Sequence, residues 1–196
     1  MEPNENNNSD EIEEEDLEKK KEFETVDALY EGGQVVIPVN KAEFFIEHGY
    51  YGTKQDDGSL TLDQVETVLL LERNRIKIFN KVGKEYQYEE MINKFIESNP
   101  DFWVNYLVYK DLRGRGYIVR PGFGEASAYR IYGRGAKVGV NPSKFVVSII
   151  TEGLSLNLMD LDKIVKAAKS IRKNLVLAVV DRQGEVTYYK CNAVDL

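Results

Sequence analysis

The segment at residues 175–180, Leu-Val-Leu-Ala-Val-Val, consists of six consecutive apolar residues. An unbroken apolar run of this length, bounded by turn residues, indicates a strand that is buried on both faces of a sheet. Before this run lies a long helical pattern, which begins at Asn157. After the run, the turn Asp181–Gly184 leads into a further strand at 186–190. The sequence therefore predicts a sheet covered by helices.

The second half of the chain extends this α/β pattern. Residues 99–101, Asn-Pro-Asp, combine an N-cap residue, a proline suited to the first helical position and an acid for the first turn. A helix and a new domain are predicted to begin there, and the helix ends at Gly114 or Gly116. Strands are then expected at 117–120, 128–132 and 145–150. The result is a mixed sheet flanked by helices.

The first half predicts a smaller α+β arrangement. Strand patterns occur at 34–38 and 76–79, and helical patterns begin near Asn40, Thr61 and Tyr86. The helix from Asn40 ends at Gly49, and Thr61 with Gln64 has the pattern of a capping box. His48 precedes Gly49, where a charge or hydrogen bond near a helix C-terminus explains it better than catalysis does.

Three segments are expected in all. Residues 1–24 hold 11 acids, three lysines and almost no apolar side chains, so they are predicted to form a disordered acidic tail. Residues 25–99 form an N-terminal domain and residues 100–196 a C-terminal domain. The predicted class is α/β (α+β): a small N-terminal α+β domain followed by an α/β domain with a mixed sheet flanked by helices.

Charge is distributed unevenly between these segments. The net charge of the chain is −7, and residues 25–100 carry 13 acids against eight bases. Residues 101–196 carry nine acids against 15 bases, a net charge of +6. A basic half in an acidic protein is typical of a protein that binds a polyanion. An ordinary solvated surface is the alternative.

Composition excludes several classes of protein. No run of about 18 apolar residues is present, so no membrane span is expected, and the acidic start does not resemble a secretory signal. Cys191 is the only cysteine and His48 the only histidine. Neither an internal disulfide nor a zinc site can be built from them, so we expect a cytoplasmic protein without metal or other cofactor.

Basic residues recur at helical spacing in the second half. Lys166, Lys169 and Lys173 are separated by three and four residues, which places them on one face of the predicted helix, with Arg172 beside them. This face either binds a polyanion or simply solvates an exposed helix.

Longer blocks of sequence are more distinctive. The second half contains YLVYKDLRGRGYIVRPGFG (106–124), YRIYGRG (129–135), SKFVV (143–147) and IRKNLVLAVVDRQGEVTYY (171–189). The first half contains ALYEGGQVVIP (28–38), EHGYYG (47–52) and LLLERNRI (69–76). In this order they closely resemble the tRNA-splicing endonuclease family of archaea over about residues 25–196. The resemblance implies that the C-terminal domain is nuclease-like.

The resemblance also implies a reaction. Members of this family cut precursor tRNA at bulge–helix–bulge junctions without metal, and leave 2′,3′-cyclic phosphate and 5′-OH ends. The chemistry needs a base, an acid and a cation, which the family supplies as Tyr, His and Lys. Tyr132 matches the tyrosine and Lys173 the lysine, but Pro142 stands where the histidine is expected. Proline has neither an ionisable side chain nor an N–H group to replace it.

Neighbouring positions also depart from the family pattern. Ala128 replaces an aspartate, and Lys166 replaces an arginine that commonly helps to hold a bulged base; a lysine lacks the planar guanidinium fork. We expect Lys166, Lys169 and Arg172 to contact RNA. The alternative interpretation makes Tyr132 a buried strand aromatic and Lys173 an ordinary cation at a helix end.

Assembly is implied by the resemblance too. Family members form tetramers or pseudo-tetramers in which an acidic loop of one subunit enters a basic pocket of another and C-terminal strands pair. The matching loop here spans 181–185 and retains Asp181 and Glu185, although Arg182 weakens the match. An ordinary hairpin turn is the alternative. The apolar Val194 and Leu196 near the C-terminus would need a cover if the last strand were unpaired.

Three hypotheses follow. The chain is a structural subunit of a heteromeric tRNA-splicing endonuclease, whose partners are precursor tRNA and a catalytic subunit with an intact histidine. Alternatively it is a catalytic subunit that cuts with Tyr132 and Lys173 and uses water as the acid. The third alternative is an RNA-binding scaffold without nuclease activity.

Overall fold

The computed structural model describes residues 25–123 and 127–192, and in these residues it contains two mixed β-sheets and five helices. The α+β class predicted from the sequence is therefore confirmed. The acidic tail at 1–24 and the apolar residues Val194 and Leu196 lie outside the described residues. None of the described helices combines the length and the apolar character needed to cross a membrane.

The first sheet is built from the first half of the chain. Its elements are β1 (Val26–Glu31), β2 (Gln34–Ile37), α2 (Val39–Gly49), β3 (Thr53–Lys54), β4 (Leu60–Leu62), α3 (Gln64–Glu72), β5 (Ile76–Phe79), β6 (Glu85–Tyr86) and α4 (Tyr88–Ser98). The strand order is β3-β4-β2-β1-β5-β6, and only β1 and β5 pair in parallel. The strands at 34–38 and 76–79 were thus predicted correctly in position.

Three expected helix starts in this half are wrong by one to three residues. The helix α2 begins at Val39 after Pro38, one residue before the predicted cap. The capping box of α3 is formed by Asp63 and Glu66, because Thr61 pairs with Val36 inside β4 and keeps an extended backbone. Tyr86 likewise lies in β6, opposite Ile78, so α4 begins two residues later.

The second sheet is built from the second half. Its elements are α5 (Phe102–Gly114), β7 (Ile118–Pro121), β8 (Tyr129–Tyr132), β9 (Phe145–Thr151), α6 (Leu158–Ser170), β10 (Asn174–Val180) and β11 (Val186–Cys191). The strand order is β11-β10-β9-β8-β7, with β9 and β10 parallel. The helix α5 begins at Phe102, later than predicted, because Asn99 still closes α4 and its side-chain oxygen accepts a hydrogen bond from the Asp101 amide.

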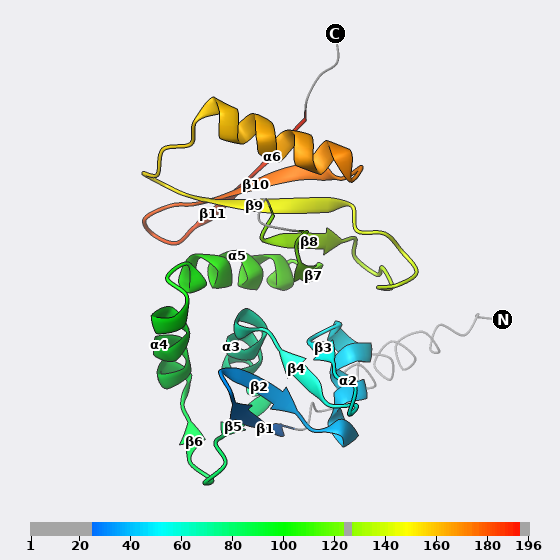
Figure 1. Cartoon of the computed structure of the whole chain (residues 1–196), viewed down its shortest axis with the longest axis vertical. Coiled ribbons are helices and arrows are strands. Elements are labelled where there is room, and N and C mark those ends of the chain that lie inside the picture. The colour runs from blue at the N-terminus through cyan, green and yellow to red at the C-terminus, as the bar shows by residue number, and fades with distance from the viewer. Residues whose placement is uncertain (1–24, 124–126, 193–196) are drawn as a thin grey trace, which may run out of the picture.

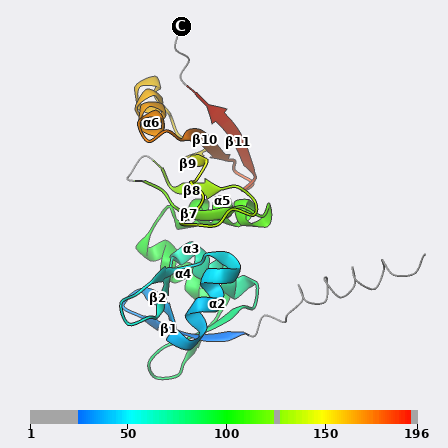
Figure 2. The same cartoon turned by 90° about the vertical axis from the view of Figure 1, so that its right-hand side faces the viewer.

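Helices cover both faces of this second sheet. Figures 1 and 2 show α6 on one face and α5 on the other. Neighbouring residues of β9 alternate between these layers: Val146 packs in the cluster under α6, and Val147 packs in the large cluster around α5. In β10, Leu177 and Ala178 alternate in the same way. The six-residue apolar run is buried on both faces, as predicted.

The helix α5 also joins the two halves. Figure 1 shows it between the second sheet and α3, and buried residues of both halves form one continuous apolar cluster. Glu66 lies in this joint with only 3% of its surface exposed. The apolar core continues across residues 99–100. The division into two domains at this position stays a prediction.

Candidate functional site

Three side chains of the second half originate at the same end of neighbouring strands. Tyr132 ends β8, Lys144 immediately precedes β9, and Lys173 immediately precedes β10. The register aligns them, because Phe145 lies opposite both Ile131 and Asn174. The fold therefore brings the predicted tyrosine and lysine to one end of the sheet, together with Lys144. We call this region the sheet end.

Lys173 is held in place by the segment that contains the expected histidine position. Its Nζ donates a hydrogen bond of 2.7 Å to the carbonyl oxygen of Ser143, the residue after Pro142. Pro142 is exposed, whereas Ser143 is buried. The ammonium group thus lies next to the segment of Pro142, where the resemblance predicts a general acid, and a proline side chain cannot transfer a proton.

Lys173 does not belong to the helix that precedes it. The helix α6 ends at Ser170, and Arg172 adopts a left-handed conformation with φ +55°. The amides of Arg172 and Lys173 donate to the carbonyls of Lys169 and Ala168, which is the Schellman pattern of helix termination. The prediction that Lys173 shares a helix face with Lys166 and Lys169 is therefore wrong, because the chain reverses at Arg172.

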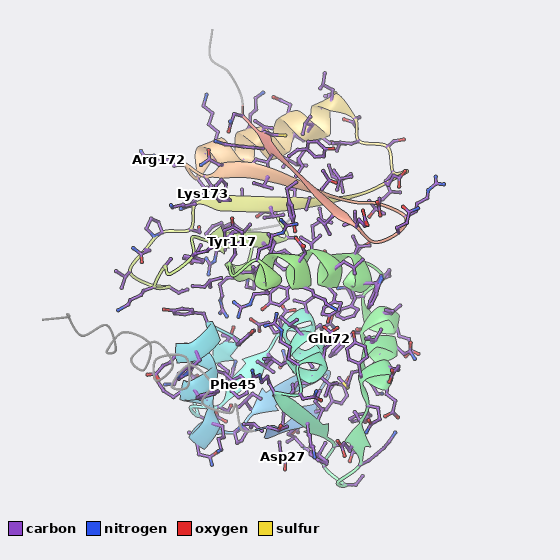
Figure 3. All side chains as sticks on the ribbon, turned by 180° about the vertical axis from the view of Figure 1, so that it is seen from behind. Asp27, Phe45, Glu72, Tyr117, Arg172 and Lys173 are labelled. Carbon is purple, nitrogen blue, oxygen red and sulfur yellow. The ribbon has the colours of Figure 1, made fainter. Side chains whose placement is uncertain are left out.

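The lysines of α6 differ in their surroundings. Lys166 forms an ion pair of 2.7 Å with Asp162, and Lys163 forms one of 3.0 Å with Asp160. The outer face of α6 therefore carries both signs of charge. Arg172 and Lys173 lie beyond this mixed face, and Figure 3 shows them together at one side of the molecule.

Tyr132 is buried, with 7% of its surface exposed. Its neighbour Ile131 packs in the cluster around α5, so Tyr132 belongs to the opposite side of β8. The only histidine, His48, lies on α2 in the other half of the chain, where its Nδ1 is 3.0 Å from the carbonyl oxygen of Phe44. Its ring stacks on the Phe44 ring at 4.3 Å, in keeping with a structural position at the helix end.

The loop between β10 and β11 is a compact turn. The Asp181 carboxylate accepts hydrogen bonds from the amides of Gln183 and Glu185, at 2.9 and 2.8 Å. This acid therefore shapes the turn, while Glu185 and Arg182 are exposed. A subunit-docking role for Asp181 and Glu185 stays a prediction.

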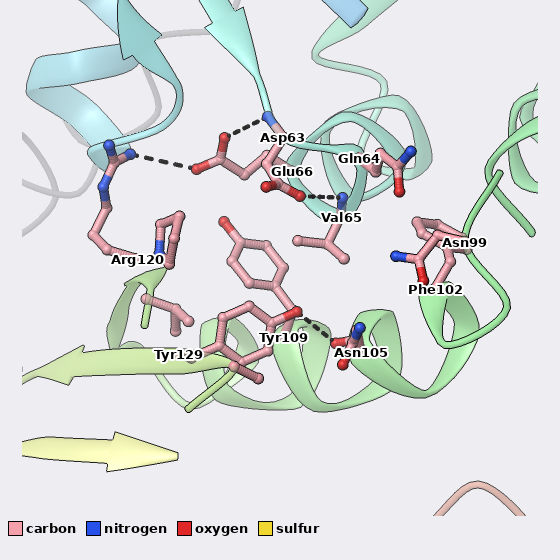
Figure 4. Close-up of a pocket in the computed structure, with 13 residues that line it drawn as sticks. Asp63, Gln64, Val65, Glu66, Asn99, Phe102, Asn105, Tyr109, Arg120 and Tyr129 are labelled. Atoms are coloured by element: carbon pink, nitrogen blue, oxygen red, sulfur yellow. Dashed lines mark hydrogen bonds and ion pairs between the residues drawn. The ribbon is translucent and has the colours of Figure 1, made fainter. Parts of the chain in front are cut away.

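A pocket of about 230 Å³ lies in the joint between the halves (Figure 4). The Glu66 carboxylate there accepts hydrogen bonds of 3.0 Å from the amides of Gly52 and Asp63, and Arg120 Nη1 lies 3.5 Å from it. Burial raises the pKa of Glu66. Sequence reasoning missed Glu66 and Arg120, which are 54 positions apart; the only local signal was the Asp63–Glu66 spacing of a capping box.

The polar groups of this pocket connect the two halves of the chain and do not form a reactive set. Tyr109 lines the pocket, and its buried hydroxyl has no hydrogen-bond partner among the residues that the structure describes. Burial raises the pKa of Tyr109 well above its ordinary value, so the phenol is a poor base. Within the part of the chain that the structure describes, no three His, Cys, Asp or Glu side chains gather in a way that could hold a metal ion.

These features define a two-sheet α+β protein with a cationic sheet end. Residues 26–92 match the family described as "tRNA intron endonuclease, N-terminal domain", and residues 102–188 match "tRNA intron endonuclease, catalytic C-terminal domain". The chain belongs to the tRNA intron endonuclease family.

Curated relatives agree with this assignment. A "tRNA-splicing endonuclease" of Thermococcus onnurineus is 38% identical over 134 residues, which are 68% of this chain and 76% of the relative. One of Methanothermobacter thermautotrophicus is 35% identical over 72% of this chain and 82% of the relative. A third, from Methanococcoides burtonii, is 33% identical over 80% of this chain, which corresponds to only 43% of the relative.

Proposed function

We propose that this chain is a structural subunit of a heteromeric tRNA-splicing endonuclease that removes introns from precursor tRNA. The relatives share that activity by name, and both parts of the chain match the family. In this proposal a second subunit with an intact Tyr, His and Lys set performs the cleavage at the bulge–helix–bulge site. The present chain supplies its fold and its cationic surface to the complex.

Pro142 carries this proposal. The departing 5′-oxygen needs a proton, and the residue at this position has none to give. Lys173 Nζ donates to the carbonyl of Ser143, so part of its capacity as a donor is used within the chain. In this proposal Tyr132 is a buried strand aromatic, and Lys173 is a cation of the sheet end that takes no part in cleavage.

A second candidate function rests on the alignment of three strand ends. Because β8, β9 and β10 bring Tyr132, Lys144 and Lys173 to one end of the sheet, a catalytic subunit with an altered set of residues is the alternative. Water would then replace the histidine as the acid. Loss of a general acid slows a reaction by about 10²–10⁴-fold, so this alternative predicts slow but measurable cleavage.

The test uses the full chain alone and a bulge–helix–bulge RNA in the presence of a chelator. We expect no product with 2′,3′-cyclic phosphate ends until a catalytic subunit of the family is added. Cleavage by the chain alone at a rate within about 10⁴-fold of the complex supports the catalytic alternative, and cleavage at the rate of the complex refutes the structural role.

The variant Pro142→His sharpens this test. If Tyr132 and Lys173 are still positioned for the reaction, a histidine at 142 should raise cleavage above that of the unmodified chain. Pro100→His, in the segment between α4 and α5, is the matched control because it adds the same imidazole away from the sheet end.

A further inference from the structure

A second pocket, of about 380 Å³, lies where the two halves meet near the start of β7. Its walls come from three segments distant in sequence: the end of α2 at 47–50, residues 113–118 from the end of α5 to the start of β7, and residues 135–137 after β8. The first wall belongs to the first half and the other two to the second. We call it the α2–β7 pocket.

Basic residues surround this pocket at fixed positions. The guanidinium group of Arg113 lies 4.3 Å from the centre of the Tyr51 ring. That of Arg134 lies 5.5 Å from the Tyr117 ring, and Arg134 Nε donates a hydrogen bond of 3.0 Å to the carbonyl of Arg115. Aromatic contacts of this kind orient a guanidinium and leave its other N–H groups for a ligand.

The charges of the pocket are predominantly positive. Arg113 and Lys137 line it and Arg134 lies at its margin; none of the three has a carboxylate partner among the described residues. Glu47 is the acidic residue in the wall. His48 and Tyr50 are the other titratable residues that the end of α2 contributes to it. An anion entering here meets three cations and one carboxylate.

Glycines keep part of the wall open. Gly135 has φ +72°, and a Cβ placed there would meet no atom within 4 Å. Gly116 has φ +82°, with Arg134 Nε 3.9 Å from such a Cβ. The backbone is therefore accessible at both turns, so that a phosphate can approach the main chain closely.

The pocket continues the sheet end. The loop that follows Tyr132 supplies its third wall, and Lys144 Nζ lies 3.7 Å from a Cβ placed at Gly133. In Figure 1 this β8–β9 loop extends towards α2, and Figure 3 shows Tyr117 on the same side of the molecule as Lys173. Cations thus follow one another from Lys173 through Lys144 and Arg134 to the pocket.

We propose that the α2–β7 pocket binds the strand of RNA that leads away from the intron junction, through its phosphates and one unpaired base. Arg134, Arg113 and Lys137 contact the phosphates, and the base stacks beside Tyr117. Cations interleaved with aromatic faces are the arrangement that single-stranded RNA recognition uses. This inference rests on the proposed function.

The test compares RNA affinities of the full chain by fluorescence anisotropy with a bulge–helix–bulge RNA, between about 50 and 200 mM salt. In the double variant Arg134→Gln/Lys137→Gln we expect affinity to fall about tenfold or more. The slope of log affinity against log salt should become shallower by about two, one for each lost phosphate contact. Lys77→Gln/Lys81→Gln removes the same charge from β5 and the turn that follows it, and should change affinity less than about twofold.

Tyr117→Leu separates stacking from charge. It should lower affinity about fivefold or more with an unchanged salt slope, since base stacking is not an ionic contact. The inference is overturned if the double variant binds RNA with the affinity and salt slope of the unmodified chain. It is also overturned if the double variant changes the molecular mass of the complex with a catalytic subunit while its RNA affinity is unaltered, because an acidic protein segment would then occupy the pocket. If the unmodified chain and its complex with a catalytic subunit both fail to bind the RNA, the proposed function fails instead.

Discussion

Charged side chains have opposite surroundings in two regions: the joint between the two halves, and the sheet end. In the joint, Glu66 is buried and receives two amide hydrogen bonds, with Arg120 beside it. Arg120 also donates a hydrogen bond of 2.7 Å to the carbonyl of Tyr50, which links β7 to the end of α2. At the sheet end, Lys144 and Lys173 have no carboxylate partner among the described residues, and Lys173 donates only to a carbonyl.

The difference separates two uses of charge. A buried carboxylate with several donors fixes the relative position of two elements, because leaving either partner alone is expensive. A half-exposed ammonium without a counter-ion contributes little to folding and keeps its field available for a polyanion. Substitutions in the joint should therefore act on stability, and substitutions at the sheet end on RNA affinity.

Glu66→Ala should have the largest effect. It removes one of the two side-chain acceptors of the capping box, leaves Arg120 without its carboxylate and creates a cavity, so we expect the free energy of unfolding to fall by about 3–5 kcal/mol. Denaturant unfolding measures this loss. RNA affinity per folded molecule should stay within about twofold of the original, since no phosphate contact is removed.

Glu43→Ala provides the control for this prediction. Glu43 pairs with Lys54 at 3.5 Å on the surface, where an ion pair contributes about 0–1 kcal/mol. If the two substitutions destabilised the protein equally, the joint would not depend on the buried carboxylate.

Lys173→Gln should act mainly on RNA. Loss of one cation at the sheet end is expected to weaken binding about fivefold to tenfold and to make the salt slope shallower by about one. The lost hydrogen bond to Ser143 should reduce stability by only about 1 kcal/mol, because the group is partly exposed. Lys173→Arg retains the charge and should recover most of the affinity; failure to do so would point to a role other than phosphate contact.

Local sequence was enough to predict the regular part of the second sheet. The six-residue apolar run identified β10, and Asn157 was correctly predicted as the N-cap of α6, where its side chain accepts a hydrogen bond of 2.8 Å from the Asp160 amide. These elements are determined by side chains that lie within a few positions of one another. Their periodicity and capping chemistry are therefore visible in the sequence.

Other features depend on residues distant in sequence. Thr61 and Gln64 have the spacing of a capping box, but strand pairing with β2 takes Thr61 and shifts the box to Asp63 and Glu66. The contact between Glu66 and Arg120 joins two halves, and no periodicity encodes it. The end of α6 was missed because the left-handed position is occupied by Arg172, where a glycine would have marked it.

Arg172→Gly tests that unusual helix end. Glycine adopts φ +55° without steric strain, so we expect the free energy of unfolding to rise by about 0.5–1 kcal/mol while RNA affinity falls with the lost charge. Arg172→Ala removes the same charge but keeps the strain, so it should lose affinity equally and gain no stability. Equal stabilities of the two variants would mean that the backbone at this position is not strained.

Lys166→Gln should have the smallest effect. Its side chain is 72% exposed and pairs with Asp162 on the same helix, so stability should change by less than about 0.5 kcal/mol. RNA affinity should fall less than about threefold, because the neighbouring carboxylate already offsets the field of this lysine. Filter-binding titrations of Lys166→Gln and Lys173→Gln at one salt concentration provide the comparison. If both variants lost affinity equally, pairing with a carboxylate would not determine which cations bind RNA, and the distinction between the outer face of α6 and the sheet end would have to be abandoned.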